Sequence, residues 1–358
     1  MEIKAKIISN SNNEETVSVE IDGFSASVPF GISAGKHEAV SVPVVKALEN
    51  IEKIIAPKLK EIDIKNQAEV DRLLISLKEL GANATLPVSI AALRAGTSLP
   101  LWKRISELSK REPKIPKPMI LLMEGGKHGQ GLDIQEFMIV PKEDSFFNCL
   151  EKGKKAFFDL RELLPSVSLG AEGALTPSFK TREALDKIME VTDDDIALDV
   201  ASSEFYSNGK YSFEGKDLTK EELQEYYREL VGDYPIISIE DPFSEDDEWL
   251  KLDGVLLVGD DLTVTNVKRI KEKKDYCQAC IIKPNQIGTV TETIEACKLA
   301  LSFNWKLIVS HRARETMDDF IADLSVGVGA DFIKTGAVTQ KERMAKYNRV
   351  LAIEKEIC

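Results

Sequence analysis

The strongest constraint on the fold of this chain is a repeat of short apolar runs that end in ionisable residues. Beyond residue 118, the runs IALDV, PIISIED, VLLVGDD, ACIIK, KLIVSHR and ADFIKTG alternate with amphipathic, charged segments. Runs of this length between helical segments are typical of buried parallel strands. Their ionisable ends are Asp199, Glu240, Asp260 with Asp261, Lys283, His311 with Arg312, and Lys334.

The spacing of these ends fits the successive units of a β/α barrel. Positions 199, 240, 260, 283, 311 and 334 are separated by 41, 20, 23, 28 and 23 residues. The carboxyl ends of all strands in such a barrel open on one mouth, so their polar residues share a pocket. A doubly wound open sheet is the alternative, but it would line only a crevice at its switch point. We therefore predict a β/α (TIM-type) barrel.

The N-terminal part has the pattern of a smaller α+β domain. Apolar residues alternate with period two from residue 3 to 28, and Asp22-Gly23 supplies a hairpin turn. Helical periodicity follows over residues 44–59, 69–80 and 90–108. The proline-rich segment EPKIPKP then interrupts the pattern. We predict an N-terminal α+β cap domain over residues 1–115 and the barrel over residues 116–358.

The composition excludes several classes of protein. A net charge of −13, from 47 basic and 60 acidic residues, argues against a nucleic-acid-binding surface, which needs clustered Lys or Arg. No apolar stretch reaches the roughly 18 to 20 residues of a membrane span. The N-terminus lacks the pattern of a secretion signal, so we expect a cytoplasmic protein. The lone CxxC pair, Cys277 and Cys280, is more typical of buried small hydrophobic residues than of zinc or redox chemistry.

Three of the strand ends carry carboxylates that predict a metal site. Asp199, Glu240 and Asp260 would converge from three consecutive strands, where they repel one another unless a cation lies among them. Oxygen ligands without His or Cys favour Mg²⁺. The alternative is that each acid caps a helix or pairs with a neighbouring Lys.

The later strand ends carry positive charge. Lys283 follows the apolar run ACII, and burial or a nearby cation would lower its pKa and make it a base. A lone strand-end Lys is more often a salt-bridge partner. His311, Arg312 and Lys334 would bind a phosphate or carboxylate.

Three further segments complete the candidate site. GGKHGQGLDIQEFMIV contains His128 and Glu136, and LGAEGALTPSF contains Glu172. A carboxylic acid facing Lys283 across the pocket would form an acid/base pair with it. The segment PFGISAGKHEA around Ser33 has the glycines of a mobile lid, although it could be only a turn.

Several long motifs in this chain resemble those of the enolases. They are SIEDPFSEDD, VGDDLTVTN, IKPNQIGTVTETIEA, VSHRARETMDDFIADL and IKTGAVTQKERMAKYNRVLAIEKEI, and weaker matches extend over nearly the whole chain. The resemblance implies an N-terminal α+β cap, a barrel, and Mg²⁺-dependent interconversion of 2-phosphoglycerate and phosphoenolpyruvate in glycolysis. It also implies a homodimer that acts on a small phosphorylated carboxylate.

The resemblance also implies a role for each candidate residue. Asp199, Glu240 and Asp260 match the ligands of a tightly held Mg²⁺, and Ser33 matches a lid residue that holds a second ion. Lys283 matches the base that removes the C2 proton. Glu172, with Glu136 beside it, matches the acid that helps the C3 hydroxyl leave. The positions that match substrate contacts are His128, His311, Arg312 and Lys334.

Some family features are replaced in this chain. NSNNEET stands in place of a motif close to DSRGNPT, and Ala171, Ala313 and Glu124 stand where Asp, Ser and Asn are usual. Loss of a hydroxyl at the expected phosphate site would weaken binding by roughly 1 to 3 kcal/mol, which retunes specificity without abolishing the chemistry. Two alternatives to enolase therefore stay open: a paralogue acting on another hydroxy carboxylate, and a non-catalytic binding or scaffold protein.

Overall fold

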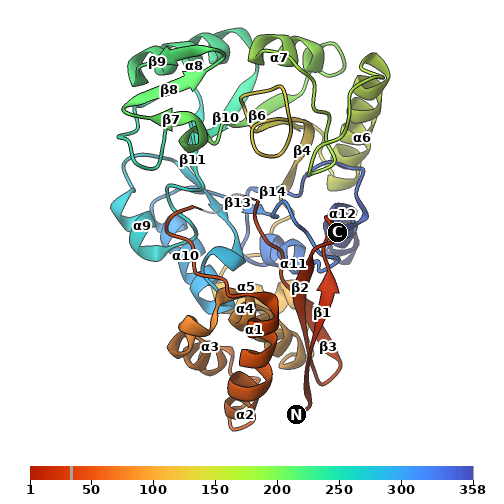
Figure 1. Ribbon diagram of the computed structural model, residues 1–358. Coiled ribbons are helices and arrows are strands. Elements are labelled where there is room, and N and C mark those ends of the chain that lie inside the picture. The colour runs from red at the N-terminus through yellow and green to blue at the C-terminus, as the bar shows by residue number, and fades with distance from the viewer. Residues whose placement is uncertain (33–34, 358) are drawn as a thin grey trace.

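A closed barrel of eight strands forms the larger part of the molecule (Figure 1). This structure is a computed structural model, and it describes residues 1–32 and 35–357. The barrel strands are β4 (Lys117–Glu124), β5 (Glu136–Val140), β6 (Asp195–Asp199), β10 (Ile236–Glu240), β11 (Leu256–Gly259), β12 (Ala279–Ile282), β13 (Lys306–Ser310) and β14 (Phe332–Lys334). The predicted TIM-type barrel with a smaller N-terminal domain is confirmed.

The six predicted apolar runs form β6 and β10 to β14, and each pairs in parallel with its neighbours in this series. Two further strands complete the barrel. β4 is parallel to β14, whereas β5 is antiparallel to both β4 and β6. One strand therefore runs against the others, which the parallel pattern of the runs did not predict.

Helices surround the barrel, as the amphipathic segments between the runs indicate. They are α6 (Phe146–Leu163), α7 (Thr181–Met189), α8 (Lys220–Asp233), α9 (Val267–Glu272), α10 (Val290–Ser302), α11 (Phe320–Gly327) and α12 (Lys341–Ile357). A small antiparallel sheet follows β6 and consists of β7 (Tyr206–Ser207), β8 (Lys210–Phe213) and β9 (Lys216–Leu218). One short helical turn, η3 (Ser202–Phe205), precedes this sheet, and another, η4 (Pro284–Gln286), follows β12. None of the helices in the described part of the chain is long and apolar enough to cross a membrane.

The N-terminal domain has the predicted strand meander followed by helices. Its elements are β1 (Ile3–Ser9), β2 (Glu15–Ile21), β3 (Phe24–Ser27), α1 (Val44–Asn50), η1 (Ile51–Ile55), α2 (Ala56–Leu59), α3 (Gln67–Ser76), η2 (Lys78–Leu80), α4 (Ala82–Ala95) and α5 (Leu101–Ser109). Asp22 and Gly23 form the turn between β2 and β3 with φ of 49° and 88°, the left-handed region that tight hairpins require.

The helical periodicity predicted over residues 90–108 belongs to two helices rather than one. α4 ends at Ala95 and α5 begins at Leu101. Pro100 precedes the first residue of α5, and a proline disfavours helical backbone in the residue before it. The chain therefore breaks between the two apolar stretches and turns to place α5 against α11.

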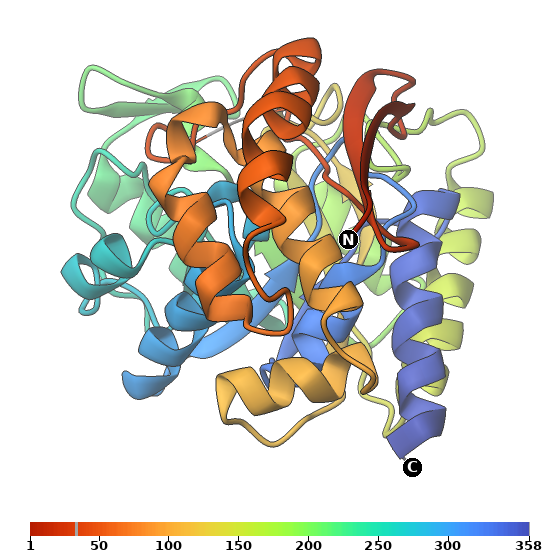
Figure 2. The ribbon, with the colours of Figure 1, turned by 90° about the horizontal axis from the view of Figure 1, so that it is seen from below.

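The N-terminal domain packs against the barrel, below it in Figure 1 and in front of it in Figure 2. α4 contacts α10 and η4, and η4 begins directly after Lys283. An ion pair joins the domains where Arg94 Nη1 lies 2.7 Å from Asp318 Oδ2. The N-terminal domain thus lies beside one edge of the barrel mouth.

The two cysteines of the CxxC pair lie in and next to β12. Cys277 and Cys280 are both buried free thiols, and burial raises the pKa of each. These are the properties of small hydrophobic residues, in line with the interpretation favoured from the sequence.

Candidate active site

Four carboxylates lie in a row at the mouth of the barrel. Glu124 ends β4, Glu136 opens β5, Asp199 ends β6 and Glu240 ends β10, and the strand register pairs each with the next. Because β5 is antiparallel, its first residue reaches the mouth that its neighbours reach with their last. All four side chains are buried, so a nearby positive charge is needed to stabilise them.

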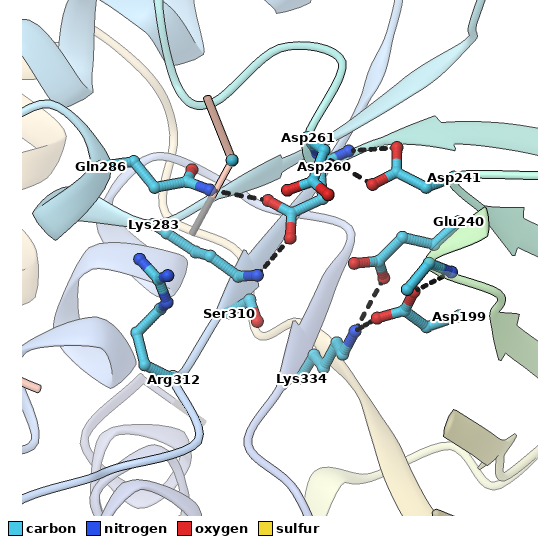
Figure 3. Close-up of polar contacts among 12 residues, drawn as sticks. Asp199, Glu240, Asp241, Asp260, Asp261, Lys283, Gln286, Ser310, Arg312 and Lys334 are labelled. Carbon is cyan, nitrogen blue, oxygen red and sulfur yellow. Dashed lines mark hydrogen bonds and ion pairs between the residues drawn. The ribbon is translucent and has the colours of Figure 1, made fainter. Parts of the chain in front are cut away.

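Lys334, the last residue of β14, supplies positive charge to this row. Its Nζ lies 2.8 Å from Asp199 Oδ2 and 2.8 Å from Glu240 Oε2 (Figure 3). The same Nζ lies 3.1 Å from Glu136 Oε2. Burial opposes the charged form, but the three carboxylates outweigh burial and raise the pKa of Lys334 well above its ordinary value. The ammonium is therefore charged at neutral pH and bridges strands β5, β6 and β10.

A second ammonium–carboxylate pair lies on the neighbouring strands. Lys283 Nζ bonds to the carboxylate of Asp260, whose other oxygen accepts a 2.9 Å hydrogen bond from Gln286 Nε2 (Figure 3). Asp241 accepts the backbone N–H groups of Asp260 and Asp261 at 3.0 and 2.8 Å, which fixes the turn after β11. The barrel therefore aims the third predicted metal ligand at the predicted base.

The contact with Asp260 sets the direction of the pKa shift of Lys283. Burial acts to lower this pKa, but the charge of Asp260 outweighs burial and raises it. Of the two alternatives that the sequence left open for Lys283, a base with a lowered pKa and a salt-bridge partner, this arrangement has the ion pair of the second.

Glu172 lies between the two predicted histidines. Its Oε2 is 3.1 Å from His311 Nε2, and its Oε1 is 3.6 Å from His128 Nδ1. Glu136 Oε1 is 3.7 Å from the same His128 nitrogen. Burial acts to raise the pKa of Glu172, but His311 and His128 outweigh burial, so this pKa lies well below its ordinary value. Burial raises the pKa of Glu136 well above its ordinary value. The pKa values of the two acids are therefore shifted in opposite directions.

Glu124, one of the replaced family positions, binds the backbone of the loop that carries Glu172. Its carboxylate accepts the backbone N–H of Glu172 at 3.0 and 3.1 Å and that of Ala174 at 2.9 Å. A Cβ on Gly170 would lie 2.5 Å from this carboxylate, so only glycine lets the loop approach so closely. Burial and the charge of Glu172 raise the pKa of Glu124 to about 8.

The guanidinium of Arg312 is held by a carboxylate of the predicted lid segment. Its two terminal nitrogens lie 3.0 Å from the two oxygens of Glu38, and Nη1 also donates to Asn285 Oδ1 at 2.9 Å. This fork-to-fork arrangement is the one a phosphate or carboxylate of a ligand would adopt. Ser33, the predicted ligand in the same segment, lies outside the described residues.

Most of the predicted residues line one partly enclosed pocket at the barrel mouth. The nine that do so are His128, Glu136, Glu172, Asp199, Asp260, Lys283, His311, Arg312 and Lys334. Glu240 is not on the pocket wall, but it contacts Lys334 there. Ala313, where a serine is usual, also lines the pocket and leaves this part of the wall without that hydroxyl.

The donor set of this pocket fits a hard divalent cation. Its side chains offer clustered carboxylates, and Glu240 Oε1 is buried with no hydrogen-bond partner among the described residues. Three groups of His, Asp and Glu atoms also lie close enough to share an ion: Glu124, His128 and Glu172; Glu136, Glu172 and His311; and Asp241, Asp260 and Asp261. Asp199, Glu240 and Asp260 do not appear together in any of these groups. Asp199 and Glu240 both contact Lys334, and Asp260 contacts Lys283.

Four residues that the sequence-based reasoning missed contribute to the site. Glu38 lies within the lid segment, Gln286 follows Lys283 closely, and Asp241 follows Glu240 directly, so proximity to a predicted residue could have marked all three. Arg343 contributes through its contact with Nδ1 of His311, and it is different because it is a helical residue in a charged stretch. No sequence signal separated it from a solvent-exposed arginine.

Comparison with known proteins gives matches over both parts of the chain. A family model described as "Enolase, N-terminal domain" matches residues 1–105, and one described as "Enolase, C-terminal TIM barrel domain" matches residues 112–358. An enolase of Anaplasma phagocytophilum is 42% identical over 377 residues, covering 93% of this chain and 87% of the relative. An enolase of Methanocaldococcus jannaschii is 40% identical over 403 residues, covering 99% and 95%. The chain therefore belongs to the enolase family and is a hydro-lyase.

Proposed function

We propose that this enzyme reversibly dehydrates 2-phosphoglycerate to phosphoenolpyruvate. The observation that carries the proposal is that Lys283 and Glu172 line the same pocket as Asp199, Asp260 and Lys334. Such a pocket brings a base, an acid and a cluster of metal-binding oxygens to one small substrate. Family membership gives the substrate class, a small phosphorylated carboxylate.

Lys283 is the base in this proposal and removes the C2 proton of the substrate. It directly follows β12, and its side chain is only 13% exposed. Its Nζ must be neutral to accept a proton, and contact with Asp260 stabilises the charged form. Base catalysis therefore requires Lys283 to separate from Asp260 when the substrate binds.

Glu172 and Glu136 form the acid that delivers a proton to the departing C3 hydroxyl. They face the same His128 nitrogen from 3.6 and 3.7 Å. A pair of carboxyl groups whose environments shift their pKa values in opposite directions can hold one proton between them. In this arrangement Glu136 is the member that holds it, because burial raises its pKa.

Mg²⁺ is the proposed cofactor, held by Asp199, Glu240 and Asp260, with a second ion that Ser33 would help to hold. When bound, such an ion stabilises negative charge on a substrate carboxylate and so makes the neighbouring carbon acid stronger. Lys334 contacts two of the three ligands, so the protein itself keeps these oxygens oriented inward.

The remaining predicted residues bind the substrate in this proposal. Arg312 offers two parallel donors to the phosphate once Glu38 releases them. His311, His128 and Lys334 line the rest of the pocket. Ala313 removes one donor from the phosphate side, which lowers affinity without touching the reacting carbons. We also infer, from family membership, a cytoplasmic homodimer, and light scattering after gel filtration would test its mass.

The test is the absorbance rise of phosphoenolpyruvate when the purified protein is given 2-phosphoglycerate, with Mg²⁺ or with EDTA. We expect turnover that requires Mg²⁺ and disappears in Lys283→Ala. Lys268→Ala is the matched control, because the side chain of Lys268 is 84% exposed on α9 and should be dispensable. A folded wild-type protein that turns over no 2-phosphoglycerate would refute the proposal and favour another hydroxy carboxylate or a scaffold role.

A further inference from the structure

Arg343 is a fully buried arginine that lies behind the pocket, on the first turn of α12. Its guanidinium donates to the carbonyl oxygens of Ala171 at 3.3 Å and Ala313 at 2.9 Å, and its Nε donates to Gln340 Oε1 at 2.8 Å. Its Nη1 contacts Nδ1 of His311. None of these partners is a carboxylate, so the charge is directed at carbonyls and at one imidazole nitrogen.

The contact with His311 determines where the ring carries its proton. A guanidinium has five N–H donors and no acceptor, so a ring nitrogen that contacts it must offer a lone pair. Nδ1 of His311 is therefore unprotonated, and a neutral ring then carries its proton on Nε2. That nitrogen is the one 3.1 Å from Glu172 Oε2.

We propose that Arg343 is a positioning residue that holds His311 as the Nε2–H tautomer and presents this N–H to Glu172 and the substrate. The role of the tautomer in turnover rests on the function proposed above, whereas the tautomer itself does not. Arg343 acts through His311 and the loop carbonyls, and it touches no reacting atom in this proposal.

Two further observations support the assignment. Burial lowers the pKa of His311 to about 4, and although Glu172 opposes this effect, Arg343 adds to it, so the ring is neutral at pH 7. The packing also leaves the ring little room to turn. A Cβ on Gly336 would lie 2.6 Å from Arg343 Cδ and 2.8 Å from His311 Cε1. Arginine, glycine and imidazole are thus packed as one unit.

The direct test is nitrogen NMR of protein labelled with ¹⁵N in its histidines. The chain has three, at positions 37, 128 and 311, so His311→Gln and His128→Gln assign the signals. We expect the wild-type His311 signals to be those of a neutral ring protonated on Nε2 at pH 7. A ring protonated on Nδ1, or on both nitrogens, would overturn the proposal without any variant of Arg343.

Substitutions then separate positioning from packing. Arg343→Lys keeps a donor-only group and should retain the tautomer, whereas Arg343→Gln offers an amide that can donate or accept and should give a mixture. Arg349→Lys is the control, because Arg349 lies on the same helix and pairs with Asp323 away from the pocket. A pure Nε2–H signal in folded Arg343→Gln would refute the proposal.

Turnover should follow the tautomer. Holding a catalytic histidine in the wrong tautomer has lowered turnover by about 10⁴ in a serine protease. We expect Arg343→Gln to lower kcat by about tenfold or more with a smaller change in KM, and Arg343→Lys to recover part of the loss. A changed tautomer with unchanged kcat would refute the positioning role, while a silent wild-type enzyme would refute the proposed function and leave the tautomer result standing.

Discussion

Lys334→Met tests the electrostatic structure of the barrel mouth. The substitution keeps the length and apolar stem of the side chain and removes an ammonium that contacts Asp199, Glu240 and Glu136. Three buried carboxylates would then share no cation. Removing one partner of a buried ion pair typically destabilises a protein by about 3 to 5 kcal/mol, because the remaining charge is left uncompensated.

This free energy translates into a measurable shift in melting. A domain of this size loses about 2 °C for each kcal/mol, so the unfolding midpoint of Lys334→Met should fall by about 6 to 10 °C in EDTA. Differential scanning fluorimetry or calorimetry measures the midpoint. Adding Mg²⁺ should recover more stability in the variant than in the wild-type protein, because the carboxylates then have no competing ammonium.

A matched control keeps the interpretation specific. Lys341→Met changes an exposed lysine whose Nζ lies 3.8 Å from Glu342, and such surface pairs contribute little. If Lys334→Met melts within 1 or 2 °C of the wild-type protein in EDTA, about as close as the control, the carboxylates do not depend on Lys334 and the reasoning fails.

Two further predictions follow from single contacts. Glu38→Gln removes the carboxylate that holds Arg312. KM for 2-phosphoglycerate should then fall by about three- to tenfold, because a charge-assisted bond to Glu38 no longer competes with the phosphate for Arg312. A raised KM in steady-state assays would contradict this prediction. Asp318→Asn breaks the ion pair with Arg94 and should lower the free energy of unfolding by about 3 kcal/mol at pH 7. Burial acts to raise the pKa of Asp318, but Arg94 outweighs burial and lowers this pKa in the folded protein. The stabilisation is therefore fully present above 3.8, the pKa of this group in the unfolded chain, and is lost as the pH falls through the lower pKa of the folded protein. In urea unfolding, the difference in free energy of unfolding between Asp318→Asn and the wild-type protein should therefore narrow as the pH falls below 3.8. A difference that does not depend on pH would contradict the assignment.

The strand ends were predictable because a single rule places them. Asp199, Glu240, Asp260 and Lys334 each stand at the carboxyl end of a short apolar run, and the geometry of a barrel brings such ends to one mouth. The rule needs only local sequence, since burial of each strand follows from its composition.

Glu136 and β5 show where that rule stops. β5 is buried along its whole length and gives no alternation that would reveal its direction, so its antiparallel pairing could not be read from residues 136–140. Glu136 reaches the mouth because it begins this strand. Its segment was marked as a candidate because it carries an acid, and its role beside Glu172 followed only from the family resemblance.

The pairing of charges was not predictable, because it depends on side chains that are distant in sequence. Glu38 and Arg312 are 274 residues apart, and no pattern links them before the domains pack together. Arg343 likewise gains its role from the position of α12 behind His311. Local sequence identifies which residues can do chemistry, whereas tertiary packing decides which of them meet.

The central claim is that Lys283 removes the C2 proton, and hydrogen exchange at that carbon tests it most directly. 2-Phosphoglycerate would be incubated with enzyme and Mg²⁺ in D₂O, and loss of the C2 proton signal would be followed by NMR. We predict exchange by the wild-type enzyme, none by Lys283→Ala, and exchange with little elimination by Glu172→Gln. Exchange at the wild-type rate in folded Lys283→Ala would contradict the account.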